Sequence, residues 1–240
     1  MRRITGGALE LLAGCKVRAD MPEHILAIDQ GTTSTRAIVF NAFAQPVGSA
    51  QVELAQHFPR PGWVEHDPEE IFRGVVDTCR QAVQDSEVGW NEISAIGITN
   101  QRETTVLWER STGRPVAPAI VWQCRRTSDR CAELVREGRS VDIRSRTGLQ
   151  IDPYFSATKL EWLLDGNPGA RRRAADGELC FGTIDSWLLY GLTGGRVHAS
   201  DITNAGRTML LNIHDQSSDQ AWDETLLDLF GVDESLLPEV

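Results

Sequence analysis

The sequence lacks the cysteine pairing that a disulfide framework or a structural zinc site requires. Its five cysteines form no CxxC pair and their number is odd, so neither kind of site is expected. Long apolar runs are missing too, because no stretch approaches the roughly 20 residues that a membrane-spanning helix needs. These absences predict a cytoplasmic protein in a reducing compartment, with no membrane partner.

Positive charge is also scarce. The formal net charge is −10, and the only lysines are Lys16 and Lys159. Phosphate backbones are bound by basic surfaces, and the short basic run at residues 171–173 does not provide one, so nucleic acid is not expected as a partner. The two common glycine-rich nucleotide motifs, GxxxxGK(S/T) and GxGxxG, are missing as well.

The first 21 residues differ in character from the rest. They contain Arg2 and Arg3 and a segment at residues 12–15 that resembles a bacterial lipoprotein cleavage site, but their apolar stretch is short and carries Glu10. Met21 stands just before the first convincing strand. We therefore interpret residues 1–21 as a non-native leader or a misassigned start, with a signal peptide as the alternative, and residues 22–240 as one domain.

The remaining pattern alternates between strand and helix signals. An Asp-Pro-Glu-Glu segment at residues 67–70 provides an N-cap, a proline in the first turn and acidic first-turn residues for one helix. We predict strands at residues 24–29, 36–40, 46–54, 93–99, 104–108 and 119–122, and helices at residues 68–84, 125–137, 160–166, 185–190 and 221–230. This order predicts an α/β or α+β domain with a mixed β-sheet flanked by helices.

Two polar segments stand between these apolar strands. Residues 29–34, Asp-Gln-Gly-Thr-Thr-Ser, place a carboxylate at a strand end and hydroxyls in a glycine-containing turn that can cradle a phosphate. The alternative is a hairpin turn without a ligand. Arg102 and Glu103 interrupt two apolar strands; as an ion pair they would read two hydroxyls of a polyol, since arginine only donates and a carboxylate only accepts. The alternative is a solvated charged turn.

Two aromatic residues and one acidic cluster are weaker candidates. Trp122 could pack on a carbon skeleton and Tyr154 could hold a hydroxyl, although core packing is the simpler interpretation of each. The Glu-His-Asp sequence at residues 65–67 suggests a metal site, but adjacent side chains diverge and Asp67 already serves as a helix cap. We therefore do not expect a metal cluster there.

Together these segments resemble the FGGY carbohydrate kinases, and within that family its glycerol kinases. The similar motifs lie, in the family's order, at residues 27–34, 61–68, 98–105, 120–127 and 151–156. The resemblance implies a ribonuclease H-like, actin-like ATPase domain. It also implies ATP-dependent phosphorylation of glycerol to sn-glycerol 3-phosphate, with ATP and Mg²⁺ as cofactors and a homo-oligomeric full-length enzyme.

Residue roles follow from the resemblance alone. Nucleotide phosphates would contact Thr32, Thr33, Ser34 and Arg36, Mg²⁺ would contact Asp29, and glycerol would contact Arg102, Glu103, Tyr154 and Trp122. The family's general-base aspartate belongs to a Gly-Asp-Gln motif that would lie beyond Val240, so no catalytic residue is assigned here. The chain is thus expected to be an inactive N-terminal domain without the ATP-binding domain, with a non-catalytic polyol-binding module as the alternative. It is also expected to expose the strand at residues 95–99 as a sheet edge.

Overall fold

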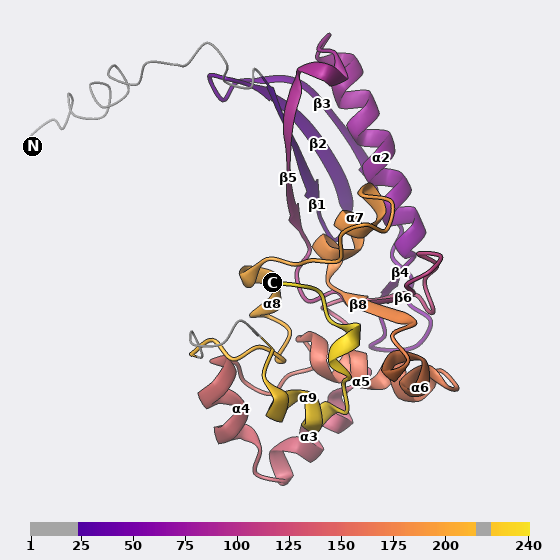
Figure 1. The fold of residues 1–240 in the computed structure, drawn as a ribbon, viewed down its shortest axis with the longest axis vertical. Coiled ribbons are helices and arrows are strands. Elements are labelled where there is room, and N and C mark those ends of the chain that lie inside the picture. The colour runs from indigo at the N-terminus through magenta and orange to yellow at the C-terminus, as the bar shows by residue number, and fades with distance from the viewer. Residues whose placement is uncertain (1–23, 215–221) are drawn as a thin grey trace, which may run out of the picture.

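The computed structural model describes residues 24–214 and 222–240. Four strands form a mixed sheet in the order β3-β2-β1-β5: β1 (His24–Gln30), β2 (Ser34–Asn41), β3 (Pro46–Glu53) and β5 (Ile93–Asn100). The first three are joined as an antiparallel meander, and β5 pairs in parallel with β1 (Figure 1). The predicted mixed sheet is therefore confirmed. Alternate side chains of β1, Leu26 and Ile28, point into the core.

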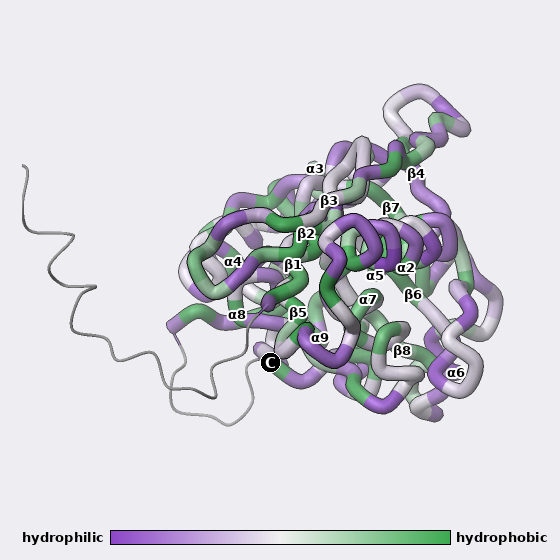
Figure 2. Tube along the Cα trace, turned by 90° about the horizontal axis from the view of Figure 1, so that it is seen from above, coloured by the Kyte–Doolittle hydropathy of each residue, from purple (hydrophilic) through white to green (hydrophobic). Residues whose placement is uncertain are grey.

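One long helix, α2 (Pro68–Asp85), packs along the sheet on the side of β2 and β3 (Figure 1). It begins as the sequence predicts, because the Asp67 side chain accepts a hydrogen bond of 2.8 Å from the Glu69 backbone N–H. Its buried residues recur at helical spacing and include Ile71, Val75 and Ala82. In Figure 2 hydrophobic stretches mark the central strands of the sheet, whereas much of α2 is hydrophilic.

The packing of α2 on β3 depends on Gly48, and this gives a first prediction. A Cβ atom at Gly48 would meet the Ala82 carbonyl oxygen and lie 2.6 Å from the Ser86 backbone nitrogen, whereas a Cβ at Gly97 on β5 would meet nothing within 4 Å. Gly48→Ala should lower the free energy of unfolding by about 1–3 kcal/mol through overpacking. Gly97→Ala is the matched control and should change it little. Urea denaturation of both variants checks this, and equal midpoints would contradict it.

The rest of the chain forms a helical region with two small two-stranded sheets. In these sheets β4 (Glu65–His66) pairs with β7 (Ala119–Ile120), and β6 (Val106–Glu109) pairs with β8 (Leu179–Gly182). The helices are α3 (Ser128–Arg136), α4 (Ser140–Thr147), α5 (Ser156–Gly166), α6 (Ala170–Ala175), α7 (Ile184–Leu192), α8 (Ile202–Ala205) and α9 (Glu224–Phe230), with short 3-10 helices η1 (Trp90–Glu92) and η2 (Glu234–Leu236). None of the described helices is long and apolar enough to cross a membrane.

Most predicted elements are present, with shifted ends. Helix α3 starts at Ser128 instead of residue 125, because the preceding residue, Thr127, has a non-helical backbone with φ of −101° and ψ of 15°. Helix α9 starts at Glu224, where the Asp223 side chain caps it by accepting from the Leu226 N–H; the earlier part of the prediction partly lies outside the described residues. Helices α4 and α6 and strand β8 were not predicted.

Candidate functional site

The phosphate-binding segment predicted at residues 29–34 contains the end of β1, the start of β2 and the turn between them. The Gly31 N–H donates to the Ser34 carbonyl at 2.9 Å, and a Cβ at Gly31 would lie only 3.0 Å from that oxygen, so the turn favours glycine. Asp29 at the end of β1 is exposed and lies opposite Arg36 in the strand register. Gln51 fixes the neighbouring groups, since its amide accepts from Arg36 Nε at 2.9 Å and donates to Ser34 Oγ at 3.0 Å.

A second turn, after β5, lies directly beside the first. The Gln101 backbone N–H donates to the Gln30 carbonyl at 2.7 Å, and its side-chain Nε2 donates to Gln30 Oε1 at 3.0 Å and to the Gly31 carbonyl at 3.2 Å. Gln101 is buried, and Thr104 Oγ1 donates to its remaining amide oxygen at 2.9 Å. Buried polar groups that are fully paired hold a unique geometry, so Gln101 locks the two turns together.

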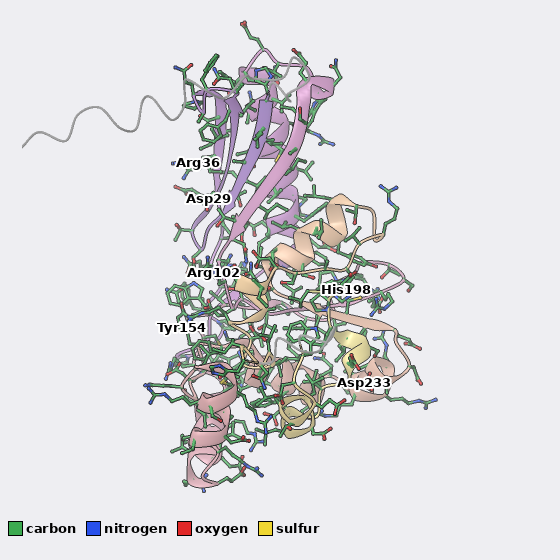
Figure 3. All side chains as sticks on the ribbon, turned by 60° about the vertical axis from the view of Figure 1, so that its left-hand side comes forward. Asp29, Arg36, Arg102, Tyr154, His198 and Asp233 are labelled. Carbon is green, nitrogen blue, oxygen red and sulfur yellow. The ribbon has the colours of Figure 1, made fainter. Side chains whose placement is uncertain are left out.

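The four residues expected to hold glycerol meet in one cavity. This cavity of about 360 Å³ is lined by Asn100, Arg102, Glu103, Trp122, Tyr154 and Arg207. The Trp122 and Tyr154 rings lie 5.3 Å apart between centroids. The indole N–H of Trp122 donates to Thr32 Oγ1 at 2.9 Å, so the cavity is joined directly to the phosphate-binding turn. Figure 3 shows Arg36, Asp29, Arg102 and Tyr154 following one another along one side of the molecule.

The expected ion pair between Arg102 and Glu103 is not what the structure shows, and this is a correction. Glu103 has a left-handed backbone conformation with φ of 61°, so its side chain turns inward and is 3% exposed. Its partner is Arg207, whose Nε lies 2.5 Å from Glu103 Oε1. Arg102 is exposed at the cavity. Neighbouring residues of a turn point apart, and Arg102 is therefore left facing the space a ligand would fill.

A completely buried lysine supports the floor of this cavity. Lys159 on α5 donates from Nζ to the carbonyls of Tyr154 at 2.6 Å and Glu103 at 3.2 Å. Ser156 Oγ adds a hydrogen bond of 3.2 Å to the Glu103 carbonyl. These donors hold Glu103 in its unusual backbone conformation. Burial lowers the pKa of Lys159 to about 7 and raises the pKa of Glu103, against the opposing effect of the Arg207 hydrogen bond.

Three supporting residues were missed from the sequence. Gln101 lies inside a recognised motif, and a glutamine after an apolar strand gives no sign of its four side-chain partners. Lys159 did leave a signal, because it stands between Thr158 and Leu160 on a face where every neighbour is apolar or small. Arg207 left none, since its partner is 104 positions away.

A magnesium ion fits Asp29 only in part. The described residues contain no group of three or more His, Cys, Asp or Glu side chains that could enclose a metal. Mg²⁺ is commonly held by one or two carboxylates together with substrate phosphates and water, and an exposed Asp29 beside the phosphate-binding turn suits that arrangement. In the Glu-His-Asp segment the side chains have other partners: Glu65 pairs with Arg126 at 2.7 Å, His66 Nδ1 lies 3.2 Å from Gln101, and Asp67 caps α2.

The fold and the cavity define the N-terminal domain of a carbohydrate kinase. Residues 24–240 match the N-terminal domain of the FGGY family of carbohydrate kinases, and the chain belongs to this family. It is 59% identical over 217 residues to the glycerol kinase of Alcanivorax borkumensis, covering 90% of this chain and 43% of that protein. It is 58% identical over 220 residues to glycerol kinase 1 of Pseudomonas aeruginosa, covering 92% and 44%. The resemblance to glycerol kinases is therefore confirmed.

Solved structures give the same family. The crystal structure of Plasmodium falciparum glycerol kinase with ADP matches with a TM-score of 0.82 and 35% identity, over 90% of this chain and 42% of that one. A gluconate kinase from Lactobacillus acidophilus matches with a TM-score of 0.76 at 22% identity, over 90% and 41%, which shows the fold alone. The predicted actin-like ATPase fold is confirmed. The chain spans about 43% of the length of the curated relatives it matches.

Proposed function

We propose that this chain provides the polyol-binding site and the phosphate-binding turn of an ATP-dependent glycerol kinase, which forms sn-glycerol 3-phosphate. One observation carries the proposal: the polyol residues Arg102, Glu103 and Tyr154 share a cavity with Trp122, whose indole N–H bonds Thr32 of the phosphate-binding turn. An acceptor hydroxyl and a phosphoryl donor placed at these two neighbouring sites would be close enough to react, which is the main requirement of phosphoryl transfer.

The cavity can recognise glycerol through hydrogen bonds to its hydroxyl groups. Arg102 offers donors at the cavity surface. Arg207 occupies Oε1 of Glu103, which leaves the second carboxylate oxygen, Oε2, to accept a hydrogen bond from a hydroxyl. The aromatic face of Trp122 gives an apolar surface for the carbon chain. Each glycerol hydroxyl both donates and accepts, so a donor and an acceptor placed side by side select a diol.

The nucleotide side is assigned by the same proposal. Thr32, Thr33, Ser34 and Arg36 would contact ATP phosphates, and Mg²⁺ at Asp29 would neutralise the charge that develops during transfer. Glu103 is the only carboxylate among the residues lining the cavity, and its two oxygens are occupied by Arg207 and by the proposed hydroxyl contact. The general base is therefore proposed to come from the part of the relatives' length that this chain does not span.

The cellular setting remains a proposal as well. Cys79, Cys124, Cys131 and Cys180 are free and buried, and burial raises the pKa values of the Cys79, Cys131 and Cys180 thiols to about 11. Such thiols are protonated and unreactive at neutral pH. This supports a reducing, cytoplasmic location, and the net charge of −10 supports small-molecule partners in place of nucleic acid. A homo-oligomeric whole enzyme is proposed from the family resemblance.

Replacing Arg102 tests the proposed function. Arg102→Ala should weaken glycerol binding about ten- to a hundredfold, because a hydrogen bond to a charged group contributes roughly 1.5–3 kcal/mol. The change strands no buried carboxylate, since Glu103 is paired with Arg207, so thermal stability should stay near that of the wild type. Isothermal titration calorimetry with glycerol measures the affinity.

The control is Arg80→Ala, which removes an arginine that is 70% exposed on α2. It should bind glycerol as the wild type does. Glycerol binding by Arg102→Ala at wild-type affinity would show that Arg102 is a solvated turn residue, and a wild-type chain that binds no glycerol would overturn the polyol site itself.

A further inference from the structure

Arg207 lines the cavity, and the sequence analysis predicts no role for it. It follows α8, and its Nε lies 2.5 Å from Glu103 Oε1. The guanidinium carbon also lies 5.4 Å from the Tyr154 ring centroid and 5.0 Å from that of Phe155. A cation at this distance from aromatic rings is attracted to them. Arg207 thus contacts Glu103 and Tyr154, two of the residues proposed to bind glycerol.

The backbone that carries Arg207 is tied to the same end of the sheet. Asp201 caps α8 by accepting from the Asn204 N–H at 2.7 Å. Asn204 and Asn100 then exchange two side-chain amide hydrogen bonds of 3.0 and 3.2 Å. Asn100 is the last residue of β5, so this amide pair fixes α8 against the turn that contains Glu103. The approach of Arg207 to Glu103 is therefore set by hydrogen bonds on both sides of the Asn204 side chain.

The carboxylate needs this partner. Glu103 is 3% exposed, and an unpaired buried carboxylate becomes protonated because burial disfavours its charge. Three charged groups face Glu103 and oppose this effect: Arg207 from beyond α8, Lys159 from α5 and Arg102 from the neighbouring turn position. Lys159 donates to the Glu103 carbonyl and not to its carboxylate. Within the described residues, only Arg207 makes a direct bond to the Glu103 side chain.

We propose that Arg207 is a positioning residue of the polyol site, which keeps Glu103 ionised, occupies Oε1 and leaves Oε2 to accept a glycerol hydroxyl. The proposal rests on the proposed function of the cavity. It makes Arg207 act through Glu103, so removal of the Arg207 charge should have the consequences of protonating Glu103. The loss of glycerol affinity should therefore depend on pH. If Arg207 had a purely structural role, the loss would be the same at every pH.

Glycerol binding by two variants at two pH values tests the proposal. Arg207→Gln keeps a neutral donor and should bind glycerol about tenfold more weakly than the wild type at pH 7, because charge-assisted hydrogen bonds are roughly twice as strong as neutral ones. At pH 9 the deficit should be smaller than at pH 7, because a higher pH favours the ionised form of Glu103. Arg207→Lys keeps the charge and should bind within about threefold of the wild type at both values. Lys159 titrates in all three proteins, so each comparison is made at one pH.

Two results would overturn the proposal: wild-type affinity of Arg207→Gln at pH 7, or a deficit that is the same at pH 9. Arg80→Gln is the matched control and should bind as the wild type does. If Arg207→Gln does not fold, Arg207→Lys still decides, because a tenfold loss in this charged variant at both pH values would show that positive charge is not what Glu103 requires.

A measurement without glycerol separates this proposal from the proposed function. Carboxyl ¹³C resonances of labelled glutamate, with Glu103 assigned by Glu103→Gln, report its pKa directly. The pKa should be higher in Arg207→Gln than in the wild type, because the variant loses the hydrogen bond and the charge that favour the ionised carboxylate. An unchanged pKa would refute the role of Arg207 even where the wild type binds glycerol. If the pKa rises in a chain that binds no glycerol, the role of Arg207 in keeping Glu103 ionised is supported, and only the proposed glycerol site is overturned.

Discussion

The folded chain is expected to gain about 3–4 kcal/mol of stability between pH 7 and pH 10 relative to a Lys159→Met variant. Lys159 is 0% exposed, and its Nζ donates to two backbone carbonyls. A neutral amine carries two N–H donors, which matches these two acceptors. Burial lowers the pKa of Lys159 to about 7 from its ordinary value of 10.5.

The direction follows from proton binding in the two states. Below about pH 10 the unfolded chain holds a proton on this lysine, whereas the folded chain releases it near pH 7. Between these values unfolding takes up a proton, so each rise of one pH unit stabilises the folded state by about 1.4 kcal/mol. The contribution is fully present above about pH 10 and is lost as the pH falls through about 7.

Urea denaturation of the wild type and Lys159→Met between pH 7 and pH 10 measures the difference in their free energies of unfolding. The contributions of titrating groups that both proteins share cancel in this difference. Arg80→Met, which alters an exposed side chain, should run parallel to the wild type. Since Lys16 and Lys159 are the only lysines, a protein labelled at lysine Cε gives two ¹³C resonances, and Lys159→Met assigns them. A Lys159 resonance that titrates near pH 10, or a stability difference independent of pH, would contradict the prediction.

The residues proposed to bind glycerol could be selected from the sequence because local motifs carry them. Arg102 and Glu103 stand out as charges between apolar strands, and Trp122 and Tyr154 belong to segments that resemble those of glycerol kinases. The structure places all four around one cavity. The start of α2 could also be predicted, because the capping residue and the acidic residues of the first turn are signals that lie within a few positions of each other.

The partners of these residues could not be found in the same way. Lys159 is 56 positions from the Glu103 carbonyl, and Arg207 is 104 positions from the Glu103 carboxylate. No local pattern encodes such distances. The expected pair of Arg102 with Glu103 was wrong for a local reason, because the left-handed backbone at Glu103 turns its side chain away from its neighbour. Charge balance at the site is a property of the tertiary fold.

The prediction of secondary structure from the sequence failed where local signals are weak. Helix α4 has no side-chain cap and presents Val141, which is 80% exposed, so neither a start signal nor an apolar face marks it. Strand β8 is buried along its whole length, and a short apolar run without alternation fits a buried helix segment as well as a strand.

Copies of this chain are expected to associate through the edge of β5, and replacing one residue of that strand should weaken this association strongly. Strand β5 lies at the end of the sheet order β3-β2-β1-β5, so no other described strand pairs with its outer side. The edge expected from the sequence at residues 95–99 is thus confirmed for the described part of the chain. Ile96 is 48% exposed, and β5 carries no charged residue between Ile93 and Asn100. Such an edge offers unpaired backbone groups to another chain.

Ile96→Lys should therefore weaken association by on the order of a hundredfold, because lysines brought together from two edges repel each other at a cost of several kcal/mol. Val141→Lys is the matched control: it puts the same charge in place of an exposed β-branched residue on α4 and should leave association unchanged. Light scattering coupled to size-exclusion chromatography over a concentration series measures both. A wild-type chain that is monomeric at all concentrations would show that its own twist and small side chains protect β5. Equal suppression by the two variants would mean that added charge, and not the edge, governs association.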